Sequence, residues 1–196
     1  MNLPNQLTVA RLILTIVFVG VLSSSIPYAA TIGTVLFIVA AFTDMLDGIL
    51  ARKLGLITDF GKLMDPLADK VLMCSTFILL VELDQLRAWV VAIILTREFL
   101  VTGLRLLASS KGQVLAADSL GKWKTILQMV TAIYLLVFLA AREGGLFGLL
   151  APLYETRLLG PALMQPILVG LTLFFTVVSG LSYLVKNWTI LRESND

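Results

Sequence analysis

Five aspartates lie within one short stretch, "DMLDGILARKLGLITDFGKLMDPLADK", of a chain that is otherwise mostly apolar. Asp44 and Asp47 are three residues apart, so they share one face of a helix. Asp65 and Asp69 are four residues apart and share a face of the next helix. Two such pairs on adjacent helices converge and repel each other unless protons or cations neutralise them. Because Mg²⁺ and Mn²⁺ prefer carboxylate oxygen, the spacing favours a divalent metal site.

The alternative is a cytoplasmic loop with solvated acids beside a packing seam of small residues. Asp59 fits this alternative best, because it falls between the two predicted helices and off both faces. Gly48, Ala51 and Gly61 leave room for a neighbouring helix or a ligand, and Arg52 suits a phosphate. The sequence has no histidine, so a general base must be a carboxylate, lysine, tyrosine or water.

The composition shows which elements must position these acids. The chain is 58% hydrophobic and 14% charged, whereas a soluble domain has about 25% charged residues. A bilayer core of about 30 Å requires about 20 apolar residues in a helix. The segments that qualify are residues 7–25, 29–54, 62–81, 88–108, 120–141 and 163–185. The sequence therefore predicts one all-α domain over residues 1–196, an integral membrane bundle of six transmembrane helices.

The distribution of basic residues predicts the orientation of this bundle in the cell membrane. With the N-terminus inside, the outer loops hold Arg87, Arg142 and Arg157. The inner ends and loops then hold Arg11, Arg52, Lys53, Lys62, Lys70, Arg105, Lys111, Lys122, Lys124, Lys186 and Arg192. This asymmetry favours both termini inside and puts the motif acids near the cytoplasm. The net charge of +2 is too small to suggest nucleic acid as a partner.

The aspartates belong to a longer pattern, D-x2-D-G-x2-A-R-x8-G-x3-D-x3-D, which is complete in this chain. Its fixed positions are Asp44, Asp47, Gly48, Ala51, Arg52, Gly61, Asp65 and Asp69. This pattern resembles the signature of the CDP-alcohol phosphatidyltransferase family. The resemblance implies a membrane transferase with a polar active-site cavity open to the cytoplasm. In that family a CDP-linked lipid donates its phosphatidyl group to an alcohol, and CMP leaves.

The resemblance also implies roles for individual residues. Asp44, Asp47 and Asp65 would ligate divalent metals, Mg²⁺ or Mn²⁺ and usually two ions. Asp69 would approach the metals and act as general base on the acceptor hydroxyl. The residues that would shape the nucleotide pocket are Gly48, Ala51, Arg52 and Gly61. The resemblance also implies that the chain forms a homodimer.

The start of the chain, "NLPNQLTVAR", is similar to the N-terminal segment of the same family. Asn5 and Thr8 are three residues apart, so both could reach the nucleotide from one helix face. The alternative is a plain interfacial helix start with Pro4 near its first turn.

A second group of residues predicts the acceptor. In "TREFLVTGLR", Glu98, Thr102 and Arg105 share one helical stripe, and Arg97 flanks it deep in a predicted span. Such positive charge suits a phosphorylated acceptor better than a neutral alcohol. Arg97 could instead pair internally, but adjacent residues face apart on a helix, which makes a pair with Glu98 awkward.

The segment "GKWKT" adds Lys122 and Lys124, which differ by about 200° around a helix and are not expected to reach one pocket together. Anchoring at the inner membrane surface is the alternative for at least one of them. The two segments resemble those of family members that use CDP-diacylglycerol and sn-glycerol 3-phosphate. Another acceptor, such as inositol phosphate, and a divalent-cation transporter are the remaining alternatives.

Overall fold

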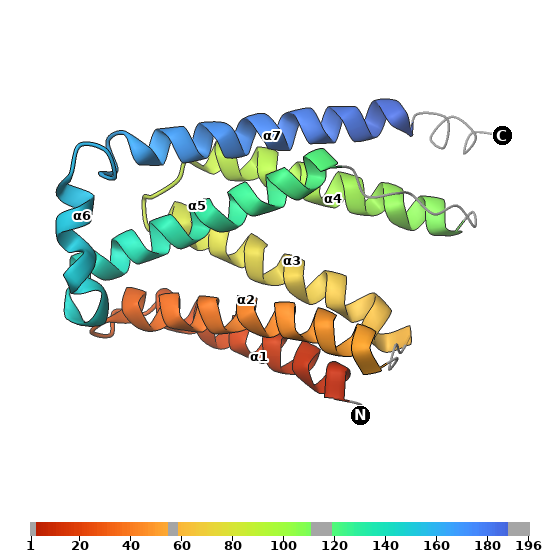
Figure 1. Ribbon diagram of the computed structural model, residues 1–196, viewed down its shortest axis with the longest axis horizontal. Helices are drawn as coiled ribbons and strands as arrows, with labels where there is room; N and C mark the ends of the chain where they lie inside the picture. The colour runs from red at the N-terminus through yellow and green to blue at the C-terminus, as the bar shows by residue number, and fades with distance from the viewer. Residues whose placement is uncertain (1–2, 55–58, 111–118, 188–196) are drawn as a thin grey trace.

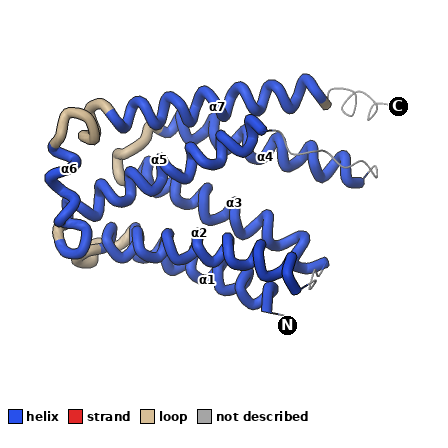
Figure 2. Tube along the Cα trace, viewed as in Figure 1, coloured by secondary structure: helices blue, strands red, loops and turns tan. Residues whose placement is uncertain are grey.

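The computed structural model describes residues 3–54, 59–110 and 119–187 of the chain. Long helices occupy all of the segments predicted from the sequence. They are α1 (Leu3–Leu22), α2 (Ala29–Leu54), α3 (Asp59–Glu82), α4 (Ala88–Ser110), α5 (Ser119–Glu143) and α7 (Met164–Lys186). A short 3₁₀ helix, η1 (Gly145–Leu150), and α6 (Ala151–Glu155) connect α5 to α7. The described ranges contain no strand, which confirms the all-α prediction (Figure 2).

The position of Asp59 corrects one expectation. This residue was predicted to lie between helices, but it is the first residue of α3. The physical reason is that an acidic residue is favourable in the first turn of a helix, because backbone N–H groups are unpaired there and the helix dipole is positive. The helix therefore begins before the apolar segment from which its start was predicted.

The long helices run back and forth, so their ends gather at two opposite ends of the bundle (Figure 1). Helix α1 packs against α2 and α3, α2 packs against α5, and α7 packs against both α5 and α4. The main core holds Phe18, Phe37, Phe77, Leu80 and Leu136. The starts of α1 and α3 and the ends of α2, α4 and α7 point to the same end, which we call the motif end because the aspartate motif lies there.

The outer surface of the bundle is strongly apolar. Ile16 is 72% exposed and Val185 is 75% exposed, and both belong to long helices. In the described part of the chain, α5 and α7 are long and apolar enough to cross a membrane, judged by length and composition. These features indicate a membrane protein, whereas six spans and their orientation stay predictions.

At the end opposite the motif, α5 is fastened to the start of α2. The carboxylate of Glu143 accepts hydrogen bonds from the backbone N–H groups of Ala30 (2.8 Å) and Thr31 (2.9 Å). The Thr31 hydroxyl donates a third bond to it at 3.1 Å. Gly144 and Gly145 follow with φ of 83° and 61°, a left-handed conformation that ends α5 at little steric cost. Glu143 thus caps α2 from another helix.

Candidate functional site

The backbone carries the aspartate motif to the motif end of the bundle. Asp44 and Asp47 belong to the second half of α2, and Asp65 and Asp69 belong to the first half of α3. These two helices contact each other, and their adjoining ends lie at the motif end (Figure 1). The helical spacing within each pair is therefore as predicted from the sequence.

The structure describes only the helical backbone at the four motif aspartates and at several predicted nucleotide residues. These residues are Asn5, Gly48, Ala51, Arg52 and Gly61. Among the side chains that are described, no group of three acidic, cysteine or histidine residues could hold a metal ion. Thr8 is described and is fully buried on α1, the helix that packs against both motif helices.

A polar cavity of about 540 Å³ lies between α3, α4 and α5. The basic residues that line it are Lys70, Arg97, Arg105, Lys122 and Lys124. Glu98 is the acid in its described lining, and Thr102 and Thr125 contribute hydroxyl groups. The excess of cations gives the wall a positive charge that suits a multiply charged anion. The predicted stripe of Glu98, Thr102 and Arg105 therefore faces one common space.

Glu98 organises the cations deepest in this cavity. Lys124, of which 3% is exposed, donates a hydrogen bond from Nζ to Glu98 Oε1. Arg97 Nη1 lies 3.5 Å from the same oxygen. The helical geometry argued against an ion pair between Arg97 and Glu98, and that prediction is wrong. The Arg97 side chain is long enough to turn back across the helix surface, so adjacent positions can still meet.

The charges of this cluster do not balance. Among the described side chains, Arg97 and Lys124 share the carboxylate of Glu98, which leaves one positive charge in excess within this cluster. A charged residue in the middle of a membrane helix costs about 2.5–3.5 kcal/mol even on a lenient scale. A further anion in the cavity would compensate this charge, and the cluster is therefore suited to bind one.

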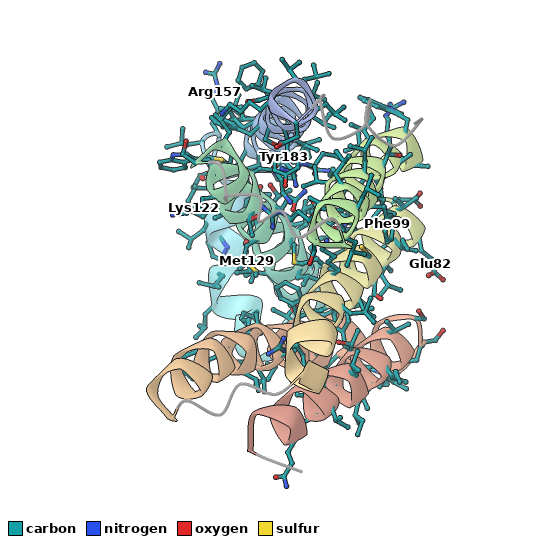
Figure 3. All side chains as sticks on the ribbon, turned by 90° about the vertical axis from the view of Figure 1, so that its right-hand side faces the viewer. Glu82, Phe99, Lys122, Met129, Arg157 and Tyr183 are labelled. Atoms are coloured by element: carbon teal, nitrogen blue, oxygen red, sulfur yellow. The ribbon has the colours of Figure 1, made fainter. Side chains whose placement is uncertain are left out.

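Arg105 lies nearer the motif end and contacts α7. Its Nε donates a hydrogen bond to the Tyr183 hydroxyl at 3.3 Å, and its guanidinium carbon lies 5.6 Å from the centre of that ring. Figure 3 looks at the motif end and shows Tyr183 facing the space between the helices, whereas Phe99 lies on the outside of α4. Tyr183 thus supports the orientation of Arg105 from another helix.

Lys122 and Lys124 both line the cavity, although the helical angle between them predicted that they would not. Lys124 is buried against Glu98, while Lys122 is exposed. Both can contribute because the cavity wall follows α5 and lysine side chains are long and flexible. Lys122 remains available to an anion, whereas the Lys124 charge is already paired.

Two residues in or beside this cavity, Lys70 and Gln128, were missed as site residues in the sequence. Lys70 directly follows Asp69 and reaches the cavity from α3. Beneath the cavity, Gln128 lines a smaller space of about 60 Å³, and in the described part of the chain its buried Nε2 has no hydrogen-bond partner. The sequence signal for Gln128 was its place one helical turn after Lys124 in an apolar segment, which a polar residue occupies at a cost.

Comparison with known proteins agrees with the motif. The family model described as CDP-alcohol phosphatidyltransferase matches residues 1–178. A Bacillus subtilis protein named CDP-diacylglycerol–glycerol-3-phosphate 3-phosphatidyltransferase is 42% identical over 99% of both chains. A Rickettsia bellii protein of the same name is 35% identical over 93% of both chains. A rice protein named cardiolipin synthase (CMP-forming) is 33% identical over 98% of this chain and 59% of its own length.

Proposed function

The chain belongs to the CDP-alcohol phosphatidyltransferase family, and we propose that it transfers the phosphatidyl group of CDP-diacylglycerol to sn-glycerol 3-phosphate. The products would be phosphatidylglycerophosphate and CMP, which makes the chain a phosphatidylglycerophosphate synthase. The Bacillus and Rickettsia relatives that carry the matching name support this choice across nearly the whole chain.

The observation that carries the proposal for the acceptor is the charge of the polar cavity. Five basic residues line it beside the single acid Glu98, in the described part of its wall. A phosphomonoester brings close to two negative charges, which arginine and lysine bind through charge-assisted hydrogen bonds. A neutral alcohol would leave the excess positive charge uncompensated. Arg97, Arg105 and Lys122 would bind the acceptor phosphate, with Lys124 as support.

We further propose that Asp44, Asp47, Asp65 and Asp69 hold two divalent ions, Mg²⁺ or Mn²⁺. The donor set fits, because four carboxylates supply the hard oxygen ligands that these ions require. Bound ions would neutralise charge on the transferred phosphorus and the leaving group. The nucleotide would be bound by Asn5, Thr8, Gly48, Ala51, Arg52 and Gly61.

In the proposed reaction, the basic residues orient glycerol 3-phosphate so that its free primary hydroxyl faces the donor. Asp69 accepts the proton of this hydroxyl. The hydroxyl oxygen forms a bond to the phosphorus of the phosphatidyl group while the bond from that phosphorus to the CMP oxygen breaks. The electron pair leaves with CMP, and the acceptor becomes the new headgroup.

The proposed setting is a multi-pass protein of the cell membrane, with the cavity open to the cytoplasm and the chain paired as a homodimer. Both substrates fit this setting, since the donor is a membrane lipid and the acceptor is a water-soluble anion. The aspartate motif and the cationic cavity both lie toward the motif end, which would then be the cytoplasmic end.

The test is CMP release by the purified protein with CDP-diacylglycerol and a panel of acceptors: glycerol 3-phosphate, inositol phosphate, serine and glycerol. We expect turnover with glycerol 3-phosphate, its loss on chelation, and its recovery with Mg²⁺ or Mn²⁺. Asp69→Asn is expected to lower kcat by at least about 100-fold. Asp59→Asn is the matched control and is expected to stay near normal. Turnover with a different acceptor alone would reject the proposed acceptor and leave the family intact.

A further inference from the structure

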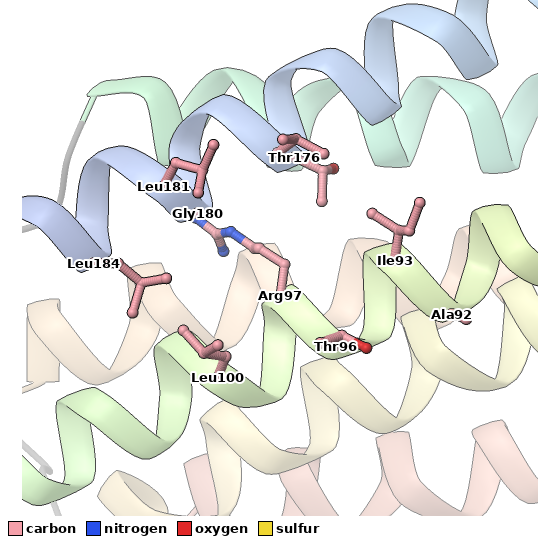
Figure 4. Close-up of a pocket in the computed structure, with 10 residues that line it drawn as sticks. Ala92, Ile93, Thr96, Arg97, Leu100, Thr176, Gly180, Leu181 and Leu184 are labelled. Atoms are coloured by element: carbon pink, nitrogen blue, oxygen red, sulfur yellow. The ribbon is translucent and has the colours of Figure 1, made fainter.

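The Arg97 side chain crosses from α4 to the surface of α7, where it meets a glycine. Figure 4 shows it directed at Gly180, with Leu100 on α4 and Leu181 and Leu184 on α7 around it. A Cβ atom added at Gly180 would lie 3.0 Å from Arg97 Cγ and 3.9 Å from Arg97 Cβ. Few Cβ atoms in proteins approach another atom so closely. The path of Arg97 therefore depends on the missing side chain at position 180.

The close contact involves the base of the Arg97 side chain and not its tip. A flexible tip could move aside at little cost, but Cγ moves only if the side chain shifts as a whole or changes rotamer. Either change would displace the guanidinium, which lies 3.5 Å from Glu98 and 3.7 Å from the Cβ position of Gly121. Gly180 thus allows this placement of Arg97, whereas a Cβ at Gly121 would make only ordinary van der Waals contact with it.

The surroundings of Arg97 explain why its placement matters. The side chain lines the polar cavity, and it also lines an apolar groove of about 320 Å³ between α4 and α7. Apolar side chains such as Ile93 and Val177 dominate the groove, so it offers little to compensate the charge. Arg97 Nε is buried and has no hydrogen-bond partner among the residues that the structure describes. An anion could compensate the guanidinium from the cavity side only if the arginine keeps this direction.

We propose that Gly180 is a positioning residue for acceptor recognition. It directs Arg97 at the phosphate of a phosphomonoester acceptor, so α7 takes part in substrate selection without contacting the substrate through a polar side chain. This inference rests on the proposed function. It assigns Gly180 an effect on binding of the acceptor phosphate and no effect on the CDP-lipid.

The experiment compares Gly180→Ala with Gly170→Ala, a matched control on the same helix. A Cβ at Gly170 meets no atom within 4 Å, and both changes raise helix propensity equally. For Gly180→Ala we expect the KM for glycerol 3-phosphate to rise about five- to tenfold, with kcat and the KM for CDP-diacylglycerol within about twofold of normal. Gly170→Ala should leave all three constants unchanged. An unchanged KM for glycerol 3-phosphate in Gly180→Ala would overturn the inference.

A double-mutant cycle with Arg97→Ala tests whether Gly180 affects acceptor binding through Arg97. Without the arginine stem there is nothing for the new methyl group to displace, so Gly180→Ala should add no further increase in KM. Additive effects would show that Gly180 acts by another route. If Gly180→Ala alone does not fold, adding Arg97→Ala should restore folding. Failure to restore it would also contradict the inference.

The outcomes separate this inference from the proposed function. Arg97→Ala alone should raise the KM for glycerol 3-phosphate by more than tenfold. If it does not, the proposed acceptor site fails. If it does, while Gly180→Ala has no effect, the acceptor site stands and the role of Gly180 alone is rejected.

Discussion

At the scale of single residues, Glu98 and Lys124 form a buried ion pair in the cavity. Both side chains are largely buried, at 16% and 3% exposure. Breaking a buried pair by removing one charge leaves the other uncompensated, which costs about 3–5 kcal/mol. We expect Glu98→Gln to lower the free energy of unfolding by at least about 3 kcal/mol, because Lys124 and Arg97 both lose the carboxylate that they share and then repel each other. Denaturant unfolding of the detergent-solubilised protein measures this change.

Replacing both partners separates the lost interaction from the cost of an unpaired charge. The double variant Glu98→Met with Lys124→Met should be more stable than Glu98→Gln, since only Arg97 then loses its partner and Lys124 no longer remains as a second buried cation. Lys122→Met is the control on the same helix, and its exposed side chain should change stability by less than about 0.5 kcal/mol. A double variant as unstable as Glu98→Gln would argue against a buried ion pair.

Arg105 and Tyr183 form a second pair whose parts can be tested separately. Tyr183→Phe removes the hydroxyl that accepts from Arg105 Nε but keeps the ring beneath the guanidinium. We expect the KM for glycerol 3-phosphate to rise about two- to threefold, since one neutral acceptor is lost. Arg105→Ala should raise it about tenfold or more, because a phosphate contact is lost. Equal effects of the two variants would mean that Arg105 acts only through its hydrogen bond with the Tyr183 hydroxyl and makes no phosphate contact of its own.

Some of the site could be predicted from the sequence, and some of it could not. The aspartate pairs and the stripe of Glu98, Thr102 and Arg105 depend on helical spacing alone, which is a local property. The meeting of Arg97 with Glu98 depends on how a long side chain bends inside a packed cavity. The contacts of Arg97 and Arg105 with Gly180 and Tyr183 depend on how α4 packs against α7, so no local pattern indicated them.

At the scale of elements, the helices were predictable because each apolar segment is long enough to be one. The residues at which helices begin were harder to predict, as Asp59 shows. A polar residue can open a helix before its apolar segment starts, because unpaired N–H groups favour acids there. The structure of the connection between α5 and α7 could not be predicted either, since η1 and α6 are too short to show a clear periodicity in the sequence.

The cap on α2 supplied by Glu143 gives a prediction at this scale. Glu143→Ala removes a carboxylate that accepts bonds from two backbone N–H groups and from the Thr31 hydroxyl. We expect the free energy of unfolding to fall by about 1–2 kcal/mol. Glu155→Ala, an exposed acid in α6, is the control and should change it little. Since the cap lies at the end opposite the motif, the KM values should stay normal, and a stable Glu143→Ala protein would contradict the capping role.

At the scale of the whole molecule, the bundle places its two groups of candidate site residues, the motif acids and the cavity cations, toward one end. The acids belong to α2 and α3, and the cations line a cavity between α3, α4 and α5. Helix α3 carries the last motif aspartate directly before Lys70, so it joins the two groups. A lipid donor held at the first group and a soluble acceptor at the second would meet there. This arrangement requires the motif end to face the compartment that supplies the acceptor.

The orientation of the whole bundle is therefore the last prediction, and it can be measured by thiol labelling. Cys74 is a free thiol, so Cys74→Ser provides a background for single cysteines. Ser25 and Ser119 are both exposed, and they lie at the connection between α1 and α2 and at the start of α5. With both termini inside, a membrane-impermeant thiol reagent added to intact cells should label Ser25→Cys and leave Ser119→Cys unlabelled until the membrane is opened.

The control for this labelling is the Cys74→Ser protein without an added cysteine, which should remain unlabelled throughout. The physical reason for the expected pattern is the gathering of basic residues near the motif end, which resists transfer across the membrane. Labelling of Ser119→Cys in intact cells, with protection of Ser25→Cys, would invert the orientation. The cationic cavity would then face away from the cytoplasm, and a cytoplasmic phosphorylated acceptor could no longer reach it.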